Sequence, residues 1–205
     1  MATMILSKIV STFQTEEVLL KYPLKYYESM NTVLLQELMR YNRLIVKIIT
    51  SLKNLIKVYE GTILINEEYE MLSQSILNNS IPESWSKVSY NSCKSLIAYV
   101  EDLKKRIDFF NNWIENGRPK VFWISGIFFT QSFLTATLQE YARKNHIPID
   151  TLSYSFQVIE DVKDPPDSGV YVNGLYLEGA RWEQGELKEC KSRELYFEFP
   201  TVRFT

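Results

Sequence analysis

The sequence predicts an α+β fold, in which an N-terminal helical bundle is followed by a small antiparallel β-barrel or sheet. Through residues 1–148, apolar side chains recur at intervals of three and four, which is the period of a buried helix face. Through residues 149–205, apolar and polar residues alternate between turns that contain glycine and proline, as in half-buried strands. We therefore expect a helical part in residues 1–148 and a β part in residues 149–205.

The composition argues against several classes of protein. The chain has 205 residues, a net charge of −2 and two cysteines, Cys93 and Cys190. These values favour a folded protein with reduced thiols over a disulfide scaffold or a general nucleic-acid binder. The most apolar stretch, residues 121–133, is shorter than the about 20 apolar residues that span a membrane. We expect no membrane partner and no nucleic-acid partner.

Residues 31–59 carry the clearest periodic pattern and predict one long helix. Eight apolar side chains spaced alternately by four and three fall on one of its faces. Further apolar residues widen this face, which favours a bundle with several neighbours. An intermolecular coiled coil through residues 34–59 is the alternative. The face consists of Leu34, Leu38, Tyr41, Ile45, Ile48, Leu52, Leu55 and Tyr59.

The remaining elements follow from shorter patterns. Helices are expected at residues 67–77, with Asn66 as N-cap, and at residues 92–115 and 131–144, in addition to a short amphipathic helix at the N-terminus. Residues 152–159, 170–182 and 194–204 are rich in β-forming residues and predict strands. The pair Asn173–Gly174 predicts either a tight hairpin turn or a bulge in one long strand.

The sequence offers little chemistry. The glycines from Gly169 to Gly179 have the spacing of a phosphate-binding loop but lack its lysine and its helix, so we expect no nucleotide cofactor. One histidine, His146, and two distant cysteines do not form a recognisable metal site. Ser125 lacks the glycine that a nucleophile elbow places two residues earlier. We predict no catalytic residue, no metal and no cofactor.

Basic residues gather on the predicted long helix. They form either its solvated face or a face that docks on an acidic surface of a larger assembly. This possible docking face consists of Arg40, Arg43, Lys47, Lys53 and Lys57.

Several strings resemble the C-terminal region of dynein heavy chains, the axonemal branch most closely. They are YYESMNTVLLQELMRYNRLI (26–45), IPESWSKVSY (81–90), FFNNWIENGRPKVFWISGIFFTQSFLTATLQEYARKNHIPIDTL (109–152) and GVYVNGLYLEGARW (169–182). The resemblance implies helices followed by a small β-barrel, lying across a ring of AAA+ modules that hydrolyses ATP and moves on microtubules. It also implies that this region has no nucleotide site and modulates the motor.

Within this resemblance, residues 121–133 are expected to join the helical part to the last helix and the sheet. The aromatic side chains of this strap are predicted to be core, and Ser125–Gly126 to form a tight turn. The core residues are Phe122, Trp123, Phe128 and Phe129. Because the family's domain continues past the position of Thr205 with further strands, we expect the barrel to be open or differently closed.

The first hypothesis is a non-enzymatic C-terminal domain of an axonemal dynein heavy chain, in the cytoskeleton of a cilium or flagellum. Its partners would be the AAA+ ring of the same chain and, indirectly, microtubules and other dynein subunits, and the isolated chain would be a monomer. The second is a free-standing dimeric coiled-coil adaptor, which pairs through residues 34–59. The third is a small hydrolase that uses Ser125 or Cys93.

Overall fold

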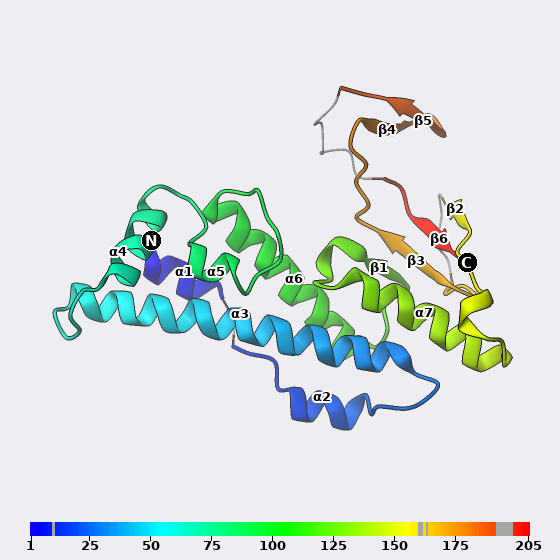
Figure 1. The fold of residues 1–205 in the computed structure, drawn as a ribbon, viewed down its shortest axis with the longest axis horizontal. Coiled ribbons are helices and arrows are strands. Elements are labelled where there is room, and N and C mark those ends of the chain that lie inside the picture. The colour runs from blue at the N-terminus through cyan, green and yellow to red at the C-terminus, as the bar shows by residue number, and fades with distance from the viewer. Residues whose placement is uncertain (10, 160–161, 163, 192–198) are drawn as a thin grey trace. The chain divides into compact units, whose positions relative to one another are not determined.

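A computed structural model describes residues 1–9, 11–159, 162, 164–191 and 199–205. The prediction of an α+β fold is confirmed (Figure 1). The α-helices are α1 (Ala2–Lys8), α2 (Thr15–Lys21), α3 (Ser29–Tyr59), α4 (Glu67–Leu77), α5 (Glu83–Ser86), α6 (Leu96–Asn116) and α7 (Thr130–Asn145). The strands are β1 (Val121–Trp123), β2 (Phe156–Val158), β3 (Val170–Asn173), β4 (Ala180–Glu183), β5 (Glu186–Glu189) and β6 (Val202–Phe204), and two 3₁₀ turns are η1 (Ile124–Gly126) and η2 (Ile149–Thr151).

The chain divides into two compact units that are not contiguous in sequence. Unit 1 comprises Met1–Lys21 and Leu35–Asn111, and unit 2 comprises Tyr22–Leu34 and Asn112–Thr205. Both units contain helices, and all the described strands lie in unit 2. Strand β1 precedes residue 148, so the main sheet draws on both of the expected parts. A domain boundary at residue 148 stays a prediction.

The predicted apolar face of the long helix is almost entirely buried. Seven of its eight side chains, from Leu34 to Leu55, are at most 3% exposed, whereas Tyr59 at the helix end is 73% exposed. In unit 1, the ring of Tyr41 on α3 lies 5.2 Å from the ring of Phe110 on α6. Burial of such a stripe supplies most of the stability of a helix in a bundle.

Helix α4 begins and ends as predicted, whereas α6 begins four residues later than predicted. The side chain of Asn66 caps α4 by accepting a hydrogen bond from the backbone N–H of Tyr69 at 3.0 Å. The first N–H groups of α6 are capped by Asn79 instead of by a neighbour in sequence. Its carbonyl oxygen accepts from the Leu96 N–H at 2.9 Å, and its side chain accepts from the Ile97 N–H at 3.2 Å. A cap from a distant segment cannot be read from local sequence.

The main sheet of unit 2 has the strand order β1-β3-β6-β2 and is mixed. Strands β3–β6 and β6–β2 are antiparallel as predicted, but β1 pairs with β3 in parallel, from Val121 opposite Tyr171 to Trp123 opposite Asn173. The expectation of a purely antiparallel sheet is therefore wrong. Parallel strands need a long crossover, and α7 lies in the sequence between β1 and β3. The described strands do not close into a barrel.

Strands β4 and β5 form a separate two-stranded antiparallel sheet. Its turn residues Gln184 and Gly185 have φ values of 55° and 83°, as a two-residue hairpin turn requires. Strand β5 was not predicted, because three of the four residues in its sequence ELKE are charged. The predicted turn or bulge at Asn173–Gly174 is neither of these in the structure, because β3 ends at Asn173 and pairs with β1 and β6, whereas the next strand, β4, pairs with β5. The first part of the predicted strand 194–204 lies outside the described residues, and β6 occupies its end.

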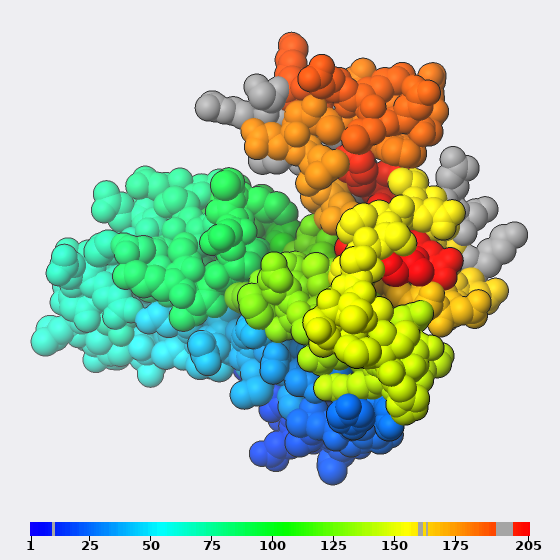
Figure 2. Space-filling view, turned by 45° about the vertical axis from the view of Figure 1, so that its right-hand side comes forward, coloured from blue at the N-terminus to red at the C-terminus, as the bar shows by residue number. Residues whose placement is uncertain are grey.

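Helix α7 follows the strap and ends at Asn145, and its C-cap residue His146 adopts a left-handed conformation with φ 56° and ψ 40°. The backbone N–H of His146 bonds to the carbonyl oxygen of Ala142, which satisfies a group at the helix end. The segment that carries η2 then lies against α7 (yellow and yellow-green in Figure 2).

Candidate functional site

The strap between α6 and α7 provides part of the core of unit 2. Phe122 is 2% exposed, and its ring centroid lies 5.2 Å from that of Trp113 and 4.9 Å from that of Phe133. Trp123 and Phe128 are half-buried. These aromatic contacts thus join the end of α6, strand β1 and α7. Each contact buries apolar surface that would otherwise face water.

Phe129 does not lie where the sequence predicts. It is 47% exposed, so the expectation of a core side chain is wrong here. The physical reason is its position as the N-cap of α7, where the backbone has left the strap and has not yet entered the helix.

Ser125 and Gly126 lie in the turn η1, directly under the indole of Trp123. A Cβ on Gly126 would come within 2.7 Å of Trp123 Cε3, and one on Gly174 within 2.6 Å of Trp123 Nε1. The indole is therefore enclosed by two residues without side chains. The Ser125 hydroxyl donates a short hydrogen bond to the carbonyl oxygen of Gly174. This hydroxyl joins the strap to the end of β3 and is committed to a structural bond.

Cys93 belongs to unit 1, whereas Cys190 and His146 belong to unit 2. Cys93 is exposed and Cys190 is half-buried, and neither forms a disulfide. His146 is the C-cap residue of α7. Among the described residues, no three His, Cys, Asp or Glu side chains gather in a way that could hold a metal ion.

In the part of the chain that the structure describes, two of the five side chains of the predicted basic face of α3 form ion pairs, and the other three do not. Arg40 bonds through Nη1 to Oε1 of the buried Glu37 at 2.7 Å, and Lys47 bonds to Glu68 on α4 at 3.0 Å. The remaining three side chains, those of Arg43, Lys53 and Lys57, are exposed. At about 100° per residue they lie on the side of the helix opposite to the buried stripe. Three cations of the five are thus displayed to solvent.

Unit 1 contains a buried polar cluster that sequence reasoning missed. Asp102 is 7% exposed and accepts hydrogen bonds from Arg106 Nε at 2.7 Å and from Lys94 Nζ at 2.5 Å. The Arg106 guanidinium lies 3.7 Å from the ring centroid of Tyr90. The pattern that could have indicated it is the i,i+4 pair Asp102–Arg106, although nothing in the sequence indicates that this pair is buried.

The protonation of this cluster follows from its burial and its partners. Burial opposes ionisation of Asp102, but the hydrogen bonds from Lys94 and Arg106 outweigh it and hold its pKa below the usual range. Burial raises the pKa of Tyr99 to about 12 and that of Tyr90 still further. Asp102 and Arg106 are therefore charged and paired at neutral pH, and the tyrosines are neutral.

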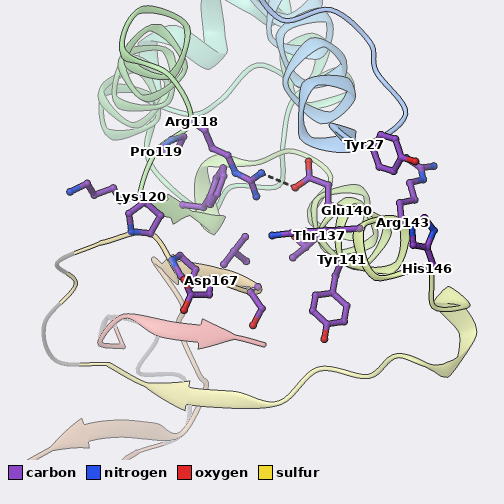
Figure 3. Close-up of a pocket in the computed structure, with 17 residues that line it drawn as sticks. Tyr27, Arg118, Pro119, Lys120, Thr137, Glu140, Tyr141, Arg143, His146 and Asp167 are labelled. Carbon is purple, nitrogen blue, oxygen red and sulfur yellow. Dashed lines mark hydrogen bonds and ion pairs between the residues drawn. The ribbon is translucent and has the colours of Figure 1, made fainter.

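Unit 2 has an open pocket of about 660 Å³, which sequence reasoning did not identify (Figure 3). Its walls come from the segment between α6 and β1, from α7, from residues 165–170 and from Tyr27. At its top, Arg118 Nη1 donates to Glu140 Oε2 at 2.7 Å, as the dashed line in Figure 3 marks. The short basic sequences GRPK (117–120) and ARKNH (142–146) are the signal that could have indicated it. They are far apart in sequence, so only the fold brings them together.

None of the described helices has a long enough apolar stretch to cross a membrane.

The comparison with known proteins covers the whole sequence. Residues 1–205 match the family described as the C-terminal domain of dynein heavy chains. The chain is 44% identical over 204 residues to dynein axonemal heavy chain 1 of Rattus norvegicus and 47% identical over 202 residues to dynein axonemal heavy chain 12 of Homo sapiens. It is 45% identical over 203 residues to dynein axonemal heavy chain 3 of Mus musculus. Each of these alignments covers 97% of this chain.

The 205 residues correspond to a small part of these relatives. They span 4% of the rat protein, 6% of the human protein and 5% of the mouse protein. The match to the family nevertheless runs from the first residue to the last. The chain belongs to the family of C-terminal domains of dynein heavy chains.

Proposed function

We propose that the chain is a non-catalytic structural and regulatory domain of an axonemal dynein heavy chain, which packs on the AAA+ ring of the same chain and modulates its movement on microtubules. The observation that carries this proposal is the match along all 205 residues to the C-terminal domain family, together with relatives that are named as axonemal heavy chains. The corresponding location is the axoneme of a cilium or flagellum.

In this proposal, hydrolysis of ATP belongs to other parts of the heavy chain, and this domain acts by contact. The exposed cations Arg43, Lys53 and Lys57 on α3 are the proposed docking face. Exposed cations on one helix side favour an acidic partner surface, and their effect is on the rate and orientation of docking more than on raw affinity.

The alternative of a coiled-coil adaptor is less well supported. The residues that would form its seam, such as Ile45 and Leu52, are 0% exposed within the single chain. A second copy could reach them only if the fold first opened. The structure therefore supports a role of this stripe in the fold of one chain.

The proposal is tested in the heavy chain that carries this domain, with Arg43→Glu, Lys53→Glu and Lys57→Glu combined. We expect an altered microtubule gliding velocity in this variant, because reversed charges repel an acidic docking surface. The matched control combines Lys87→Glu, Lys104→Glu and Lys105→Glu, which reverses three exposed charges elsewhere in unit 1. Equal velocities in the wild type and both variants, with all proteins folded, would refute the docking role of α3.

A further inference from the structure

The pocket of unit 2 combines positive charge with a preformed apolar wall. Four Arg or Lys side chains and two carboxylates line it, in a protein whose net charge is −2. Its volume of about 660 Å³ lies within the range of ligand sites, roughly 300 to 1,000 Å³. A local excess of cations in an acidic protein indicates an anionic ligand.

The carboxylate of Glu140 is paired with Arg118 within unit 2, so these two opposite charges offset each other and the excess of positive charge comes from the other cations. Its Oε1 accepts from the backbone N–H of Met30 at 2.8 Å, and its Oε2 accepts from Arg118. Arg143 is also held in place, since its Nη1 donates to the Ser29 hydroxyl at 2.7 Å. In contrast, the side chain of Lys144 is exposed and makes no ion pair or hydrogen bond within the described part of the sequence. The positive charge of Lys144 is therefore available to a ligand.

The walls of the pocket favour a peptide over a small inorganic anion. Pro119, Pro165 and Pro166 line it, and their rings fix the local backbone. The buried ring of Phe122 and the 38% exposed ring of Tyr141 add apolar surface. Such surface can cover the backbone and side chains of an extended segment, which a bare anion does not have.

The arrangement of the cations favours separate carboxylates over a phosphate. Figure 3 shows Lys120 on one side of the pocket and Arg143 with His146 on the other, so the cations do not converge on one point. Arg143 and Lys144 lie in the last turn of α7, where the negative end of the helix dipole offsets part of their charge. This field is less favourable to a dianion than to single carboxylates spaced along a peptide.

From these observations we propose that the pocket binds a short acidic peptide segment of a partner protein, with its carboxylates facing the cations and its backbone against the proline and aromatic walls. The pocket lies in unit 2 and the docking face of α3 lies in unit 1, so this proposal does not rest on the proposed function.

The test measures binding of a fluorescein-labelled hexaglutamate peptide to the 205-residue protein by fluorescence anisotropy at low salt. Lys144→Glu is expected to weaken binding about tenfold, because one attraction becomes a repulsion. Asp167→Asn, which removes a carboxylate at the pocket edge, is expected to strengthen binding about twofold to threefold. A gain in affinity cannot result from a loss of folded protein, so the two variants together separate binding from stability.

Two matched controls locate the peptide and identify its chemistry. Lys57→Glu makes the same charge change on α3 and should leave the affinity within about twofold, whereas Tyr141→Ala should weaken it about threefold through lost apolar contact. Inorganic phosphate should displace no more peptide than sodium chloride does at the same ionic strength, because only screening of the charges is expected. Equal effects of Lys144→Glu and Lys57→Glu, displacement by phosphate beyond that of chloride, or absence of binding to the wild type would each overturn the proposal.

Discussion

At the scale of single residues, unit 1 depends on a few polar groups placed inside an apolar bundle. Asp102, Arg106 and Tyr90 form one cluster. In addition, the indole N–H of the fully buried Trp85 donates a hydrogen bond to the Ser51 hydroxyl at 2.9 Å. Buried polar groups cost free energy unless every one is paired, so each of these bonds also excludes other packings of the helices. The sequence indicates which residues are polar, but it does not indicate which of them are enclosed.

Replacing Asp102 by Asn should destabilise the protein in a pH-dependent way. At pH 7 we expect the free energy of unfolding to fall by about 3 kcal/mol, because Arg106 would keep a buried charge without its carboxylate. The pKa of Asp102 is lowered in the folded state, so its contribution is present above the ordinary Asp pKa of about 3.9 and is lost as the pH falls through the lowered value. Urea unfolding at pH 7 and at pH 2.5 measures the difference.

The control for this prediction is Asp108→Asn, a change at an exposed position of the same helix, which should alter stability by less than about 0.5 kcal/mol. If Asp102→Asn lowered the free energy of unfolding equally at both pH values, the charge of the carboxylate would not be the cause of the lost stability.

At the scale of elements, helices whose ends are set by neighbouring residues have the predicted bounds. Elements whose ends depend on distant residues differ from the prediction. The Asn66 cap and the acidic first turn of α4 are local, and the predicted range 67–77 is that of the structure. Helix α6 starts at Leu96 because Asn79 caps it, and β1 is a strand because β3 offers it a parallel partner. Helix α5 follows Pro82, a residue that disfavours helix before itself and permits helix after itself.

Gly174→Ala should destabilise the contact between the strap and the sheet. We expect a loss of about 3 kcal/mol in the free energy of unfolding, partly from a side chain at φ 74° and partly from overlap with Trp123. Gly61→Ala is a close control, since Gly61 has φ 75° and open space around its Cα, so only the conformational cost of about 1 kcal/mol applies. Chemical denaturation of both variants measures the difference, and equal losses would mean that the approach of Gly174 to the indole has no energetic weight.

At the scale of the whole molecule, the backbone passes between its two units at residues 21–22, 34–35 and 111–112. Helices α3 and α6 each contribute residues to both units. Among the described strands, β1 and β2 are the outer strands of the main sheet of unit 2, and Phe156 on β2 is 65% exposed. Such an edge can pair with another strand, whereas the apolar stripe of α3 is already covered.

We expect the 205-residue protein to sediment as a monomer of 24.1 kDa across a hundredfold range of concentration, because its helical seam is buried within one copy. Sedimentation velocity checks this expectation. A concentration-dependent dimer would contradict it, and the variant Phe156→Lys would then show whether the edge of β2 is responsible, since an edge lysine opposes strand pairing.

The order of the residues was enough to predict the α+β class, the helical stripe from Leu34 to Leu55 and the membership of the family, because apolar periodicity and long runs of shared residues are visible along the chain before it folds. The folded chain was needed to establish the parallel pairing of β1, the exposure of Phe129 and the pocket that Arg118 and Lys144 both line. These features depend on contacts between segments that are distant in sequence. The free energy of such contacts is set by packing and strand pairing, which a local sequence pattern does not contain.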